Sequence, residues 1–129
     1  MTAPDAPTVV VLVVEDDDAV AELLRQVLSD EPGWTALVAH DAVAARAIVQ
    51  QVQIRVLVLD VNLPGISGLE LLELLRQDDA WSDPPVIIVS AVADQPDVQA
   101  TLRHTGVIRT LQKPFDLDQV IATIRASLA

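Results

Sequence analysis

Five polar residues stand at the ends of hydrophobic runs, and together they could perform phosphoryl-group chemistry. They are Glu15, Asp16, Asp60, Ser90 and Lys113. Carboxylate oxygens are the ligands that Mg²⁺ prefers, and lysine ammonium groups commonly bind phosphate oxygens. An aspartate carboxylate can also act as a nucleophile and form an acyl-phosphate. These residue types make Asp60 a candidate phosphoryl acceptor, provided that the fold gathers all five side chains.

The carboxylates of Glu15, Asp16 and Asp60 would repel one another in a shared cleft, and each would then resist ionising. A hard divalent cation such as Mg²⁺ relieves this repulsion, using one or two carboxylates and a backbone carbonyl after Asp60. Acidic residues at such places can instead cap helices, and Asp17 or Asp18 is expected to cap the first helix. Metal binding is the favoured interpretation for Glu15 and Asp16, because they directly end a hydrophobic run.

Lys113 and Ser90 each have an ordinary structural explanation beside the chemical one. The ammonium group of Lys113 could neutralise the carboxylates, or it could bind an oxygen of an incoming phosphoryl group. The two roles are compatible, since one charge can serve both. The hydroxyl of Ser90 would be an ordinary strand-end group if it stood alone, and its interest comes from the four residues expected beside it.

The elements that position these residues follow from the alternation of two sequence patterns. Continuous hydrophobic runs rich in β-branched residues predict strands, whereas apolar residues spaced three or four apart predict amphipathic helices. The predicted strands cover residues 8–14, 34–39, 55–59, 85–90 and 107–112. The predicted helices cover residues 17–28, 42–52, 68–76, 96–104 and 116–128.

Strands that are hydrophobic throughout are typical of a sheet buried on both faces. The alternation therefore predicts an α/β fold, a doubly wound parallel sheet of five strands with five helices. Each helix is long enough to make the right-handed crossover that parallel strands require. Ligands of such folds bind at the carboxyl ends of the strands, near the point where the strand order reverses. The five polar residues occupy those ends, so we expect their side chains to converge.

Local signals refine the predicted helices. Asp41 and Ser67 precede the second and third helices and are expected to cap them. The apolar spacing in the first helix includes Leu23, and that in the second includes Val43, so both side chains are expected to point inward.

Length and composition narrow the class of protein. The 129 residues suit one domain, here placed at residues 8–129 after a tail at 1–7. The absence of cysteine excludes disulfides, thiolate metal sites and cysteine nucleophiles. A net charge of −11 argues against direct nucleic-acid binding. The sequence has no basic region of the kind that begins a signal peptide, and no apolar run near the ~20 residues of a membrane helix. A cytoplasmic protein without membrane association is therefore expected.

Four segments resemble the signature segments of response-regulator receiver domains. They are VVVLVVEDD at 9–17, LVLDVNLPGISG at 57–68, PVIIVSA at 85–91 and KPF at 113–115. They occur in order, and the resemblance spans the chain from about Thr8 to Leu128. It implies a flavodoxin-like fold whose parallel strands are ordered 2-1-3-4-5.

The resemblance also implies roles for individual residues. Glu15 and Asp16 match the acidic pair that helps to bind Mg²⁺, and Asn62 matches the residue whose backbone carbonyl is a further ligand. Asp60 matches the phosphoryl acceptor, which is also a metal ligand.

Ser90 matches the hydroxyl that moves onto the phosphoryl group, and Lys113 matches the lysine that binds it. The bond between Lys113 and Pro114 is similar to one that is cis in the family.

A receiver of this kind takes its phosphoryl group from a phosphohistidine on a sensor histidine kinase or a phosphotransfer protein. It catalyses only its own phosphorylation and dephosphorylation, and is not an enzyme in the usual sense. Its output would be a population shift of the fourth helix, fifth strand and fifth helix toward a downstream protein that the sequence does not name. A homodimer is among the assemblies that the resemblance allows.

Four positions depart from the family pattern. Thr110 stands where the family usually has Tyr or Phe, so either ring-swing signalling is absent or a smaller shift replaces it. Ile108 and Arg109 replace an acidic pair that DNA-binding relatives use in dimer salt bridges. Val92 cannot orient an attacking water, so a long-lived phosphoryl group is expected.

Other functions fit the residues less well. A haloacid-dehalogenase-like phosphatase wants a second aspartate where Asn62 stands, and a nucleotide-binding module wants a Gly-rich loop after the first strand. A pseudo-receiver, which keeps the fold and takes no phosphoryl group, is the main alternative. His40 and His104 are interpreted as surface residues.

Overall fold

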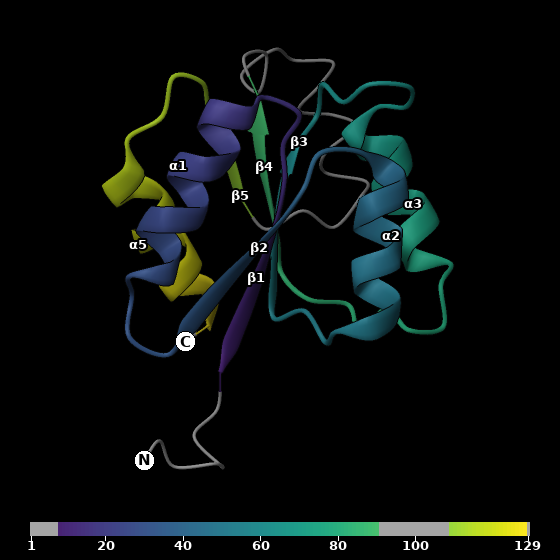
Figure 1. Ribbon diagram of the computed structural model, residues 1–129, viewed down its shortest axis with the longest axis horizontal. Coiled ribbons are helices and arrows are strands. Elements are labelled where there is room, and N and C mark those ends of the chain that lie inside the picture. Colours follow the sequence, from purple (N-terminus) through teal and green to yellow (C-terminus); the bar gives the residue numbers. More distant parts are fainter. Residues whose placement is uncertain (1–7, 91–108, 129) are drawn as a thin grey trace.

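The computed structural model describes residues 8–90 and 109–128. Five strands form one parallel sheet with helices on both sides (Figure 1). The strands are β1 (Val9–Val14), β2 (Trp34–Ala39), β3 (Val56–Asp60), β4 (Val86–Ser90) and β5 (Arg109–Gln112). The helices are α1 (Asp18–Ser29), α2 (Ala42–Gln51), α3 (Gly68–Arg76) and α5 (Leu117–Leu128).

The strand order is β2-β1-β3-β4-β5, and every neighbouring pair is parallel. This order confirms the doubly wound, flavodoxin-like fold expected from the sequence. Most predicted bounds agree with the structure to within one residue. The helix predicted at 96–104 lies outside the described residues, as do Val92 and His104.

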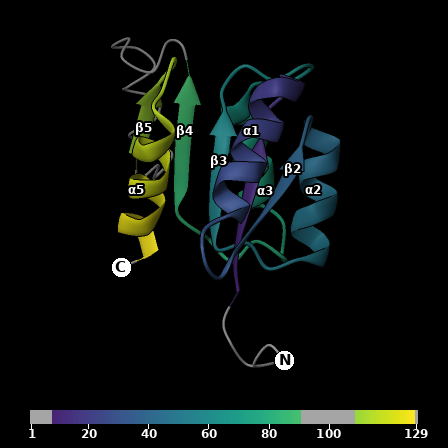
Figure 2. The same cartoon turned by 60° about the vertical axis from the view of Figure 1, so that its left-hand side comes forward.

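The sheet divides the core into two layers, as expected for strands buried on both faces. Helices α1 and α5 cover one face, while α2 and α3 cover the other (Figures 1 and 2). Within β1, Leu12 and Val14 pack toward α2 and α3, whereas Val11 and Val13 pack toward α1 and α5. All four are at most 1% exposed. Each such burial stabilises the fold by roughly 1.5–3 kcal/mol, which fixes the sheet as a rigid platform.

The N-termini of three helices are capped as the sequence indicates. Asp17 caps α1 by accepting from the N–H of Val20, and Asp41 caps α2. Ser67 caps α3 within a reciprocal capping box that includes Glu70. These caps fix where each helix begins after the strand-end loop that precedes it.

Two helix-face predictions were wrong. Leu23 is 48% exposed and Val43 is 79% exposed. The buried residues of α2 are Ala45 and Val49, and a residue two positions from either lies about 200° around the helix. Apolar spacing shows that a stripe exists, but only the packed neighbours decide where its centre lies.

Among residues 8–90 and 109–128, no helix is both long and apolar enough to cross a membrane.

Candidate functional site

Two acidic side chains are buried at the carboxyl edge of the sheet. Glu15, which follows β1, is 3% exposed, and Asp60, the last residue of β3, is 5% exposed. They are the buried charged residues of the part of the chain that the structure describes. Because a buried carboxylate is costly unless it is paired, this pair marks the place in the fold where charge has been concentrated.

Lys113, just after β5, joins the two buried carboxylates. Its Nζ donates to Oε1 of Glu15 at 2.7 Å and to Oδ2 of Asp60 at 2.9 Å. The Lys113 side chain is 25% exposed, so it is less buried than the two carboxylates that it contacts. One positive charge thus faces two negative charges, and the three-residue cluster is one cation short of neutrality.

The pKa values of these groups reflect that imbalance. Burial raises the pKa of Glu15 to about 7; the Lys113 hydrogen bond opposes this rise, and the neighbouring Asp60 adds to it. Burial lowers the pKa of Lys113, but its bonds to Glu15 and Asp60 outweigh burial and raise that pKa above its ordinary value. The lysine therefore stays charged at neutral pH, while Glu15 ionises with difficulty.

Asp16 completes a cluster of three carboxylates. Its side chain is exposed, and its carboxylate lies with those of Glu15 and Asp60 so that one oxygen from each falls within 4.8 Å of the others. Opposite ligands of an octahedral Mg²⁺ lie about 4.2 Å apart, given bonds of about 2.1 Å. The 4.8 Å limit is close to that span, so the three carboxylates are candidate ligands of one hard cation.

The loop after Asp60 is held tightly beneath the carboxylate. The backbone N–H of Asn62 donates to Oδ1 of Asp60 at 3.0 Å, and the N–H of Gly68 donates to the carbonyl of Val61 at 2.7 Å. A Cβ atom on Gly68 would lie 2.2 Å from the backbone oxygen of Asp60. Sequence reasoning treated Gly68 only as the start of a helix and missed this close approach.

Ser90 ends β4 beside the site, with its backbone in register with Gln112 of β5. Its position in the sheet agrees with the sequence interpretation, and its hydroxyl's role stays a prediction, as does that of the Asn62 carbonyl. The Lys113–Pro114 bond is cis, as the resemblance implied. Thr110 lies within β5 and is half-buried.

His40 contacts the site, which sequence reasoning did not foresee. It is a surface residue as expected, with 52% of its side chain exposed. Its Nδ1 atom nevertheless lies 3.0 Å from the backbone carbonyl oxygen of Glu15. Its place directly after the second strand, at the same sheet edge as the acidic residues, was the available signal.

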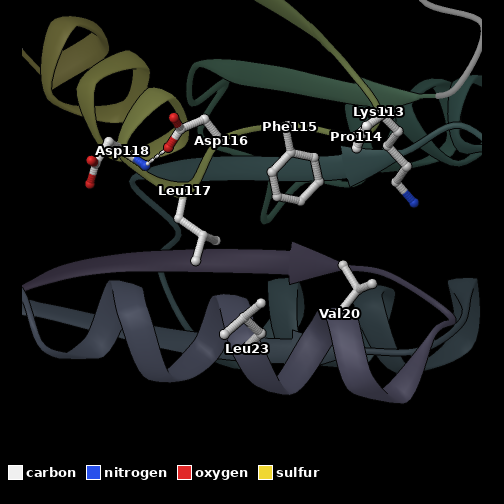
Figure 3. A pocket seen from close by; sticks show the side chains of 8 residues that line it. All are labelled: Val20, Leu23, Lys113, Pro114, Phe115, Asp116, Leu117 and Asp118. Carbon is white, nitrogen blue, oxygen red and sulfur yellow. Dashed lines mark hydrogen bonds between the residues drawn. The ribbon is translucent and has the colours of Figure 1, made fainter.

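A groove of about 910 Å³ runs beside the site, between α1 and the segment that leads into α5. Figure 3 shows Phe115 and Leu117 facing Val20 and Leu23 of α1 across this groove. Lys113 lines one end of it. The groove and the carboxylate cluster therefore share Lys113.

The fold and the polar cluster at its strand edge define a doubly wound α/β domain of receiver type, and comparison with known families agrees. The chain matches the response regulator receiver domain family over residues 11–125. It therefore belongs to that family, whose members act in two-component signal transduction.

Curated relatives include longer proteins. Transcriptional regulatory protein TrcR of Mycobacterium tuberculosis is 35% identical over 96% of this chain and 47% of its own length. DNA-binding response regulator MtrA of the same species is 34% identical over 92% of this chain and 50% of its own length. The chain thus spans about half the length of the curated relatives it matches.

Solved structures share the fold over nearly their whole length. The receiver domain of Francisella response regulator 1452 has a TM-score of 0.81 and 29% identity, covering 93% of this chain and 96% of that one. A sensor protein from Polaromonas sp. JS666 has a TM-score of 0.84 and 28% identity, covering 95% and 97%. Chemotaxis response regulator CheY4 of Vibrio cholerae, at 23% identity and a TM-score of 0.83 over 93% and 98%, is similar in fold.

Proposed function

We propose that this chain is the phosphoryl-accepting receiver of a two-component phosphorelay, with Asp60 as the acceptor. The observation that carries the proposal is the double contact of Lys113, whose Nζ donates to both Glu15 and Asp60. A structural ion pair needs one carboxylate for one ammonium. A second buried carboxylate is explained if the site must also attract a divalent cation and a phosphoryl group.

The proposed reaction is a phosphoryl transfer from a phosphohistidine of a sensor histidine kinase or phosphotransfer protein. A carboxylate oxygen of Asp60 attacks phosphorus, and the bond from phosphorus to the imidazole nitrogen breaks. The electron pair of that bond returns to the imidazole, leaving an aspartyl-phosphate on Asp60. Lys113 already faces the Asp60 oxygens, so its charge is placed to bind an oxygen of the transferred group.

The donor set fits Mg²⁺, because Glu15, Asp16 and Asp60 supply hard carboxylate oxygens within one ion's reach. The Asn62 backbone carbonyl is the further ligand in this proposal. Bound there, Mg²⁺ would neutralise charge on the phosphoryl group and its attacking oxygen. The chain's own contribution is to hold the three carboxylates together at the cost of the raised pKa of Glu15.

The output is proposed to act through a protein surface. Phosphorylation would shift the populations of the β5 and α5 region and of the helix expected before it, for recognition by a downstream protein. Residue 110 in β5 is a half-buried threonine, so no aromatic ring there can change its position on phosphorylation. A smaller displacement of the β5 and α5 region is therefore proposed. A net charge of −11 disfavours direct contact of this domain with nucleic acid.

The test is phosphorylation by acetyl phosphate with Mg²⁺, followed by intact-protein mass spectrometry. Wild-type protein is expected to gain one phosphoryl group, and Asp60→Ala to gain none. Chelation of the metal should abolish the gain. Unmodified wild-type protein in the presence of Mg²⁺ would favour the pseudo-receiver instead.

A further inference from the structure

The backbone of Glu15 is held where the sheet ladder stops. Val14 pairs with Ala39, and the N–H of Glu15 donates to the carbonyl of Ala39 at 3.0 Å. In a parallel ladder the next hydrogen bond would come from the N–H of residue 41 to the carbonyl of Glu15. Asp41 instead caps α2, and the chain has left the sheet. Nδ1 of His40, 3.0 Å from the Glu15 carbonyl, takes the place of that donor.

The geometry also specifies how His40 makes this contact. A carbonyl oxygen can only accept, so Nδ1 of His40 must carry the hydrogen of this bond. The same Nδ1 lies 3.5 Å from Oδ1 of Asp18, whose side chain is 94% exposed. That second contact is long and solvent-screened, and contributes little. The short bond to the backbone of Glu15 is therefore the one that matters.

With this bond, every polar group of Glu15 has a described partner. Its N–H bonds to Ala39 and its carbonyl to His40, while Oε2 accepts from the N–H of Asp17 at 3.3 Å and Oε1 from Lys113. The loop between β1 and α1, which carries Glu15 and Asp16, is thus anchored to β2 by a side chain.

We propose that His40 is a positioning residue for the acidic cluster, which it serves by anchoring the Glu15 carbonyl. Resting on the proposed function, the inference is that His40 sets the orientation in which Glu15 and Asp16 receive Mg²⁺. Partners that orient metal ligands from outside affect metal affinity without touching the ion. His40 touches neither the phosphoryl group nor Asp60 in this role.

The test compares two substitutions. In His40→Asn, the amide nitrogen takes nearly the place of Nδ1 and can still donate, whereas His40→Leu keeps bulk and loses the donor. Mg²⁺ affinity is measured by calorimetry, and phosphorylation by acetyl phosphate is measured as the single-turnover rate constant at saturating donor and as the donor concentration that gives half of that rate. His40→Leu is expected to weaken Mg²⁺ binding about threefold to tenfold, and His40→Asn to restore most of it.

Asp18→Asn serves as the matched control, because it removes the long contact and leaves the Glu15 bond in place. It should bind Mg²⁺ like wild type, and urea unfolding of each variant shows that all are folded. The inference is overturned if wild type and His40→Leu bind Mg²⁺ with equal affinity, or if His40→Asn does not restore the affinity. In either case the proposed function still stands, provided that the wild type is phosphorylated. A wild type that neither binds Mg²⁺ nor accepts a phosphoryl group overturns both.

Discussion

The Nζ atom of Lys113 lies 2.9 Å from Oδ2 of Asp60, across 53 residues of sequence. Asp60 ends β3 and Lys113 directly follows β5, and β4 separates these two strands in the sheet. Their contact exists because parallel strands bring all of their carboxyl ends to one edge. This contact also creates a conflict, because the same ammonium group is the hydrogen-bond donor to the buried carboxylate of Glu15 and its one positive charge is shared between two carboxylates.

That conflict predicts opposite effects of two substitutions on the metal-free protein. Asp60→Ala leaves Lys113 and Glu15 as a neutral pair, so the free energy of unfolding at pH 8 should rise by about 1 kcal/mol. Lys113→Met leaves two buried carboxylates unpaired and should lower it by about 2 kcal/mol. Urea unfolding monitored by circular dichroism, without divalent metal, measures both. Loss of stability in Asp60→Ala would contradict the idea of an overcrowded acidic site.

The pKa of Glu15 predicts how stability depends on pH. Its value of about 7 in the folded protein exceeds the ordinary 4.5, so the folded state binds more protons between these values. The free energy of unfolding should therefore be highest below pH 4.5, as far as Glu15 contributes, and should fall as pH rises to 7. Comparing urea unfolding of wild type and Glu15→Gln across this window isolates the contribution. The difference between the two proteins should level off only about one pH unit above 7, and adding Mg²⁺ should make this difference smaller.

Gly68 should tolerate no side chain. A Cβ atom there would meet the backbone oxygen of Asp60 at 2.2 Å, so Gly68→Ala must displace the loop that bonds to the Asp60 carboxylate. We expect a loss of stability of about 2–3 kcal/mol together with slower phosphorylation by acetyl phosphate.

Gly65 provides the matched control for Gly68. It has a φ of +88°, and an added Cβ would meet no atom of residues 8–90 and 109–128 within 4 Å beyond its chain neighbours, so Gly65→Ala should meet only the backbone penalty of about 1 kcal/mol. Similar losses at both glycines would show that the close approach at Gly68 is relieved easily.

Substitution of Leu23 should slow phosphoryl transfer from a protein donor and not from a small-molecule donor. Its exposed side chain lines the groove that ends at Lys113, so a phosphohistidine-bearing protein that reaches Asp60 would lie over it. Leu23→Glu should therefore slow transfer from a phosphorylated sensor kinase by about tenfold and leave the acetyl phosphate rate unchanged. Equal slowing with both donors would point to damage at the acceptor site itself. Val43→Glu, an exposed change on α2 across the sheet, is the control.

The sequence alone determined the helices and strands, and the edge of the sheet at which the polar residues lie. Apolar periodicity located β2 and α3 to the residue, and local hydrogen-bonding chemistry identified Asp41 and Ser67 as caps. These features depend on residues within a few positions of one another. The rule that parallel strands share an edge then placed Glu15, Asp60 and Lys113 together.

Only the tertiary structure decided what depends on distant neighbours. Glu15 and Asp16 are adjacent acidic residues, yet Glu15 is buried against Lys113 and Asp16 is exposed. The exposure of Leu23 and the bond from His40 to Glu15 are likewise set by elements far away in sequence. The tight clearance at Gly68 is set by the loop that returns to the backbone of Asp60. A pattern fixes which residues can pack or bond, whereas the partner that does so is chosen by the folded chain.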